Sequence, residues 1–259
     1  IYNLYDLENH LGQLNWAPTV GRTYDLFRGE GLLPYYLAEI FRELGASAAA
    51  AIKWVYALCF VLAALTMYGW VKSWLGPRAA LLAAVTYTYI PYHLVVVYVR
   101  GSLAEALVFA LLPLTFWAIR AAIHKGFSSP LDLRYVVLGF LPLLALGHAN
   151  LGLTTLCILL LIGYTWVEAR SLEVFSRLSL FLVPYFTILV GLMVAERQES
   201  WVDFYQHFVY LFQLFAITWG YGGSVPGWGD TMSFQLGLAP LGLALISILL
   251  TIRSKLVPQ

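Results

Sequence analysis

Seven long apolar runs occupy about half of this chain, at residues 54–72, 79–97, 102–120, 135–147, 153–167, 178–195 and 234–252. A helix that crosses the roughly 30 Å hydrocarbon core of a bilayer needs about 20 mostly apolar residues, and most of these runs approach that length. Only 11% of the residues are charged, far below the share of about 25% in ordinary soluble domains. The sequence therefore predicts an all-α fold, a polytopic transmembrane helix bundle with about seven spanning helices.

The apolar runs also predict how the chain is organised. We expect an extracytoplasmic segment over 1–53, a transmembrane domain over 54–252 that includes an outer loop at 196–233, and a cytoplasmic tail over 253–259. Apolar residues at helical spacing within 25–43 predict an amphipathic helix that lies in the membrane interface. The chain starts with Ile1, and residues 1–15 are too polar to span. We therefore expect a further segment, such as another helix, to precede it.

The connectors between the runs alternate between two sides of the membrane, and basic residues are denser on one of them. Nine basic residues lie in the short connectors and tail of that side: Lys72, Arg78, Arg120, Lys125, Arg134, Arg170, Arg177, Arg253 and Lys255. Six are spread over the much longer segments of the other side: Arg22, Arg28, Arg42, Lys53, Arg100 and Arg197. The positive-inside rule places the first side, with the C-terminus, in the cytoplasm.

The net charge disfavours a nucleic-acid-binding function, and the positions of the two cysteines disfavour a cysteine-based site. The net charge of +1 gives no indication of nucleic-acid binding. Cys59 and Cys157 both lie inside apolar runs, where we expect packing residues rather than a disulfide or a metal pair.

Acidic residues and histidines gather on the predicted outer side, starting in the segment 4–10. Asp6 and His10 share a face if this segment is helical, and Asp6, Glu8 and His10 align if it is extended. An acid next to an imidazole can act as a base or hold a divalent metal ion. A solvated acidic helix start explains the same residues.

The segment 91–105 places three ionisable residues near the outer ends of two runs. His93 lies close to the end of the second run, while Arg100 and Glu105 bracket the start of the third. Arg100 and Glu105 could form a structural ion pair around a helix start capped by Ser102. Arg100 is equally suited to hold a phosphate group with two parallel hydrogen bonds.

The remaining outer-side candidates lie in turns. His148 belongs to the Gly-His-Ala-Asn turn at 147–150, where a hydrogen-bonded turn histidine is the alternative. The loop 196–233 is rich in glycine and aromatic residues and contains Tyr221 and Asp230. Its aromatic side chains could anchor the loop at the membrane interface or form a platform for a sugar ring or a lipid headgroup.

Taken in order, these motifs resemble the YfhO-like membrane proteins of bacteria and archaea, which are often described as related to 6-pyruvoyl-tetrahydropterin synthase. The resemblance rests on Asp-x-x-x-His at 6–10, Pro-Tyr-His-Leu at 91–94, Tyr-Val-Arg-Gly-Ser-Leu-Ala-Glu at 98–105, the turn at His148, Trp-Gly-Tyr-Gly-Gly-Ser at 219–224 and Met-Ser-Phe-Gln-Leu-Gly at 232–237. It covers most of the chain and implies a bacterial or archaeal cytoplasmic membrane.

The family is similar to glycosyltransferases of the GT-C architecture, and this implies a function. The chain would transfer a sugar from a polyprenyl-phosphate donor at the outer face, with Asp6, Glu8 and His10 as catalytic candidates and Asp6 with His10 as candidate metal ligands. The residues implied for substrate binding are His93, Arg100, Glu105, His148, Tyr221 and Asp230. The alternative is a non-catalytic subunit of a larger respiratory or photosynthetic assembly, which packs against partner helices and lipid or quinone.

Overall fold

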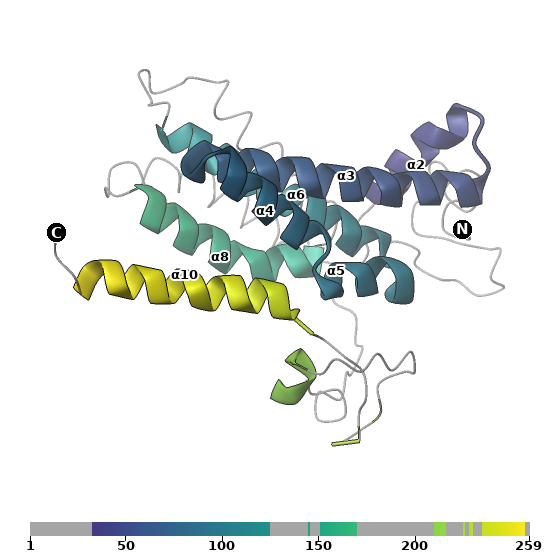
Figure 1. Ribbon diagram of the computed structural model, residues 1–259. Coiled ribbons are helices and arrows are strands. Elements are labelled where there is room, and N and C mark those ends of the chain that lie inside the picture. Colours follow the sequence, from purple (N-terminus) through teal and green to yellow (C-terminus); the bar gives the residue numbers. More distant parts are fainter. Residues whose placement is uncertain are drawn as a thin grey trace. The chain divides into compact units, whose positions relative to one another are not determined.

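The computed structural model describes residues 33–124, 145, 151–169, 210–215, 225, 228–229 and 235–256. Within them every regular element is helical, as the apolar runs predict (Figure 1). The elements are α2 (Leu33–Glu43), α3 (Ala48–Leu75), α4 (Pro77–Thr88), α5 (Pro91–Val95), the π-helical turn η2 (Val96–Arg100), α6 (Leu103–His124), α8 (Leu151–Ala169), the 3-10 turn η3 (Leu211–Leu214) and α10 (Leu238–Leu256).

The described residues contain fewer spanning helices than the sequence predicts. Two helices, Ala48–Leu75 and Leu103–Ala121, are long and apolar enough to cross a membrane, and the bent pair Pro77–Thr88 and Pro91–Arg100 is a third if it acts as one span. The apolar part of α10, Leu238–Leu250, is shorter. Apart from Ala145, the predicted runs at 135–147 and 178–195 lie outside the described residues, so the count of seven stays a prediction.

The predicted domain limits stay predictions. α2 confirms a helix over the second half of the segment 25–43. Residues 1–32, most of the loop 196–233 and the tail after Leu256 lie outside the described part of the chain. The assignment of these segments to the two sides of the membrane therefore stays a prediction.

The chain divides into two compact units. The first comprises Ile1–Ala84 and Ser102–Gln198, and the second comprises Val85–Gly101 and Glu199–Gln259. The first unit holds α2, α3, most of α4, α6 and α8. The second holds the last residues of α4 together with α5, η2, η3 and α10.

In the first unit α6 is the central helix, because it contacts α2, α3 and α8 (Figure 1). α2 packs on the start of α3, where the rings of Phe41 and Trp54 stack with centroids 6.4 Å apart. Ser47 caps α3, since its hydroxyl accepts a hydrogen bond from the Ala50 amide at 3.3 Å. Gly76, with φ of 85°, ends α3 before Pro77 begins α4.

The interface between α3 and α6 is built from small side chains. One face of α3 is buried at intervals of three or four residues, and α6 contributes buried alanines: Ala48, Ala51, Val55, Cys59, Ala63, Ala106 and Ala110. In lipid, helices associate through close packing and interhelical hydrogen bonds, and small residues let the backbones approach. The Thr66 hydroxyl lies 3.0 Å from the Ala110 carbonyl oxygen of α6, a contact that it shares with the Leu62 carbonyl oxygen of its own helix at 2.8 Å.

The opposite face of α3 is apolar and exposed. Trp54, Val61 and Leu65 each leave more than half of their surface uncovered. A helix with a small-residue face towards its neighbour and a large apolar face outwards is suited to contact with lipid. This arrangement accounts for the near absence of amphipathic patterning in the α3 sequence.

Candidate functional site

The second predicted span is broken rather than continuous. We predicted one run over 79–97, but α4 ends at Thr88 and α5 starts at Pro91, with a bend of 41° between the two halves. The cause is Pro91, whose ring disfavours helical backbone at the preceding residue. Ile90 accordingly has extended backbone, with φ of −58° and ψ of 131°. Pro91 itself suits the first position of a helix.

His93 stabilises this break. Its side chain is fully buried, and its Nδ1 lies 3.0 Å from the carbonyl oxygen of Thr88, the last residue of α4. A carbonyl only accepts hydrogen bonds, so Nδ1 carries the proton in this contact. The bond satisfies one of the carbonyl groups that a helix end leaves without a helical partner. We predicted His93 as a substrate-binding residue, and that role stays a prediction.

The broken span ends in a π-helical turn that presents Arg100. Gly101 follows with φ of 63°, a left-handed conformation that glycine adopts at no steric cost. Arg100 is exposed, and its guanidinium donates to the Tyr92 hydroxyl at 3.0 Å. Tyr98 beside it is 76% exposed. π-helical turns occur frequently at functional sites, and Tyr92 here fixes the direction of a permanently charged group.

Ser102 caps α6 as the sequence predicts. Its hydroxyl accepts a hydrogen bond from the Glu105 amide at 3.3 Å, and Glu105 is buried in the first helical turn. An acid at this position is favoured by the positive end of the helix dipole. Arg100 belongs to the second unit and Glu105 to the first. The predicted ion pair between them therefore stays a prediction.

The other predicted site residues lie outside the described part of the chain: Asp6, Glu8, His10, His148, Tyr221 and Asp230. The proposed metal ligands Asp6 and His10 are among them. Within the described residues, no group of three or more His, Cys, Asp or Glu side chains is placed to hold a metal ion.

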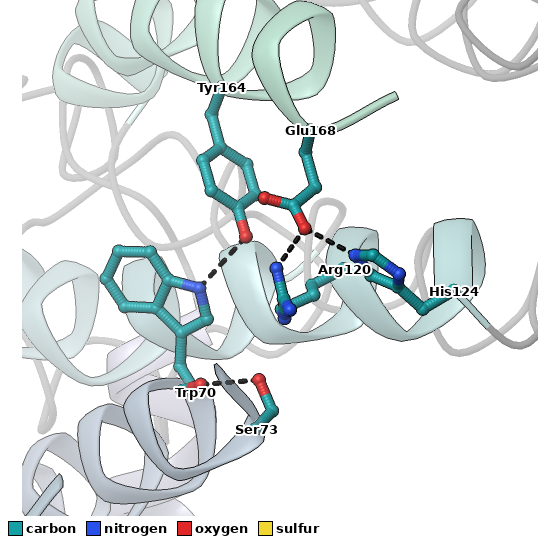
Figure 2. Close-up of polar contacts among 6 residues, drawn as sticks. All are labelled: Trp70, Ser73, Arg120, His124, Tyr164 and Glu168. Atoms are coloured by element: carbon teal, nitrogen blue, oxygen red, sulfur yellow. Dashed lines mark hydrogen bonds and ion pairs between the residues drawn. The ribbon is translucent and has the colours of Figure 1, made fainter. Parts of the chain in front are cut away.

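A second constellation joins the C-terminal ends of α3, α6 and α8, and Figure 2 shows its polar contacts. Trp70 of α3 donates its indole N–H to the Tyr164 hydroxyl of α8 at 3.1 Å. The ring of Phe116 from α6 stacks on Trp70 and meets Tyr164 edge-on, with both centroid distances at 4.8 Å. These three rings therefore bind all three helices together through aromatic contacts and one hydrogen bond.

An ionic cluster lies next to these rings. Arg120 and His124 of α6 both contact the same carboxylate oxygen of Glu168 on α8 (Figure 2). The Arg120 guanidinium also lies over the Trp74 ring, 5.9 Å from its centroid. The negative end of the helix dipole stabilises Arg120 and His124 near the C-terminus of α6. It disfavours the Glu168 carboxylate near the C-terminus of α8, and the contacts with Arg120 and His124 offset this.

This cluster is a structural clamp, and we did not predict it. Its contacts explain how α3, α6 and α8 are attached to one another. Its geometry shows that the ends of α3, α6 and α8 lie together at one end of the first unit.

Comparison with known protein families, with curated proteins and with solved structures finds no match to this chain. The family resemblance and the function that it implies therefore stay predictions.

Proposed function

We propose that the chain is an integral membrane glycosyltransferase of the GT-C type, which takes a sugar from a polyprenyl-phosphate donor at the outer membrane face. The observation that carries this proposal is the exposed Arg100, oriented by Tyr92 at the end of a broken apolar span. Breaks in spanning helices are tolerated where the backbone lines a polar or protein-filled site, and transporters use them to bind charged ligands.

The chemistry of the donor explains why an arginine would be placed there. The leaving group of the transfer is a lipid phosphate, whose negative charge must be stabilised as the glycosidic bond breaks. A guanidinium can bind two phosphate oxygens through parallel hydrogen bonds. Tyr98 and Val99, which precede Arg100 in η2, are exposed and offer apolar surface that suits a prenyl chain near the headgroup. By the family resemblance, Asp6 would be the base that activates the acceptor hydroxyl.

A transfer assay tests the proposal. Membranes containing the protein would receive a polyprenyl-phosphate-linked radiolabelled hexose, and transfer would be compared for wild type, Arg100→Ala and Asp6→Asn. We expect Arg100→Ala to lower the rate by about 10²–10³-fold and Asp6→Asn by about 10²–10⁴-fold. The matched control is Arg78→Ala, which removes an exposed arginine at the start of α4. Equal loss in Arg78→Ala, or full activity in Arg100→Ala, would contradict the role of Arg100.

A second candidate function is favoured by α10. Its consecutive large residues are exposed around the helix: Leu243, Leu245, Ile246, Ile248, Leu249 and Leu250. A helix that is apolar on all sides requires lipid or partner helices around it. We therefore keep the alternative of a non-catalytic subunit in a larger membrane assembly. Gentle purification from the native membrane distinguishes the two functions, because a subunit would be recovered with partners in fixed stoichiometry.

A further inference from the structure

Three aromatic rings form a stack in the second unit. Tyr210, Phe212 and Trp228 have centroids 4.9–6.2 Å apart and interplanar angles of 15–30°. Trp228 nevertheless leaves 80% of its surface exposed, and Phe212 leaves 41%. An exposed aromatic cluster is a common mark of a binding surface. The rings are nearly parallel, and Trp228 leaves most of its indole open to a partner.

The base of this stack is held in a fixed conformation. The Tyr210 amide donates to the Gln213 side-chain oxygen at 2.7 Å, and the Gln213 amide donates to the Tyr210 carbonyl at 3.0 Å. Gln213 is itself buried. These reciprocal bonds close η3 and fix the backbone that carries two of the three rings. A binding surface that is already ordered loses little conformational entropy when a ligand binds.

Contacts within the second unit connect the stack to the Arg100 segment. The Leu236 amide donates to the Leu214 carbonyl of η3 at 3.0 Å. The next residue, Gly237, has φ of 87° and lies so close to Pro91 that an added Cβ would be 2.8 Å from the proline Cδ. Pro91 begins the helix whose next residue, Tyr92, orients Arg100. The stack and the Arg100 segment are therefore joined through Leu214, Gly237 and Pro91.

We propose that the stack of Tyr210, Phe212 and Trp228 is a platform for the sugar ring of the lipid-linked donor. The inference rests on the proposed function and adds a sugar subsite to the phosphate site at Arg100. One face of a pyranose carries C–H groups with partial positive charge, and the face of an aromatic ring is negative. The exposed indole of Trp228 offers the largest such face. Stacking of this kind tolerates different sugars because it depends on the ring face rather than on single hydroxyl groups.

The test compares two lipids on the same protein. Wild type and variants in nanodiscs would be titrated by native mass spectrometry with polyprenyl phosphate and with polyprenyl-phosphoglucose and polyprenyl-phosphomannose. We expect the hexosyl lipids to bind wild type more tightly than the bare phosphate does. Trp228→Ala or Phe212→Ala should weaken binding of the hexosyl lipids by about tenfold relative to the bare phosphate, the size of effect that loss of an aromatic stacking partner has elsewhere. The matched control is Phe215→Ala, an exposed phenylalanine that follows η3 outside the stack.

Different outcomes separate the sugar subsite from the proposed function. If wild type binds bare and hexosyl lipids equally, or if Trp228→Ala keeps the difference, the stack is no sugar platform and an interfacial anchor explains it. If Phe215→Ala loses the difference as much as Phe212→Ala does, the effect is not specific to the stack. If neither lipid binds wild type, the phosphate site and the proposed function fail together. Trp228→Phe serves as the folding control, since it keeps an aromatic face and should retain part of the difference.

Discussion

At the scale of single residues, Glu39 in α2 lies where ionisation of its carboxyl is disfavoured. Burial raises the pKa of this carboxyl above the ordinary value of 4.5, and the neighbouring Glu43 raises it further. A raised pKa in the folded state means that folding favours the protonated acid. Glu39 therefore supports stability fully below about pH 4.5, and this contribution is lost as the pH rises through the raised pKa.

Glu39→Gln removes this pH dependence. At neutral pH we expect the free energy of unfolding to rise by less than about 1 kcal/mol, since water screens a charge near the surface. Thermal unfolding in detergent between about pH 4 and pH 8 measures the effect. Glu43→Gln is the matched control and should give a smaller change, because repulsion from Glu43 is the second of the two causes. An unaltered pH dependence in Glu39→Gln would show that this carboxyl does not contribute.

The ion pair between Arg120 and Glu168 gives a second prediction. Both side chains are less than one fifth exposed, so Glu168→Gln leaves the Arg120 charge without its carboxylate in a partly buried place. We expect the free energy of unfolding to fall by about 1–3 kcal/mol. The double variant Arg120→Gln with Glu168→Gln should recover part of the loss, because no charge is then left unpaired. Strictly additive effects in denaturant unfolding would argue against a coupled pair.

At the scale of helices, close approach decides which glycines are required. A Cβ added to Gly69 on α3 would lie 2.5 Å from the Trp117 ring of α6, whereas one added to Gly163 on α8 would meet nothing within 4 Å. Gly69→Ala should therefore force α3 and α6 apart and cost about 1–3 kcal/mol. Gly163→Ala, the matched control, should be neutral or slightly stabilising. Thermal unfolding of both variants checks this, and equal stability would rule out tight packing at Gly69.

The sequence predicted the helices better than their breaks and their contacts. Apolar runs located α3, α6, α8 and α10 because burial in lipid demands continuous apolar residues. Pro91 was visible in the sequence, and the backbone restriction before proline could have predicted the break at Ile90. The clamp of Trp70, Arg120 and Glu168 could not be found in this way, since it depends on which helices are neighbours. Ser102 was predictable because a cap is local.

At the scale of the whole molecule, a donor site at Arg100 and the aromatic stack has to lie on the outer side of the membrane. We predict that a cysteine placed at Ser224 reacts with a membrane-impermeant maleimide added to intact cells, while one placed at Ser128 does not. Cys59 and Cys157 are both free thiols and would first be replaced by alanine. The reverse labelling pattern would place the Arg100 end of the protein in the cytoplasm.

The central claim is that the end of the broken span binds a lipid phosphate, and the affinity of the protein for polyprenyl phosphate tests it most directly. Native mass spectrometry of the protein in nanodiscs would compare wild type with Arg100→Ala, Arg100→Lys and Arg78→Ala. We predict that Arg100→Ala weakens binding of polyprenyl phosphate by at least about tenfold. The affinity of Arg100→Lys should lie between those of Arg100→Ala and wild type, and Arg78→Ala should bind with the affinity of wild type. Binding by Arg100→Ala that equals binding by Arg78→Ala would contradict the claim.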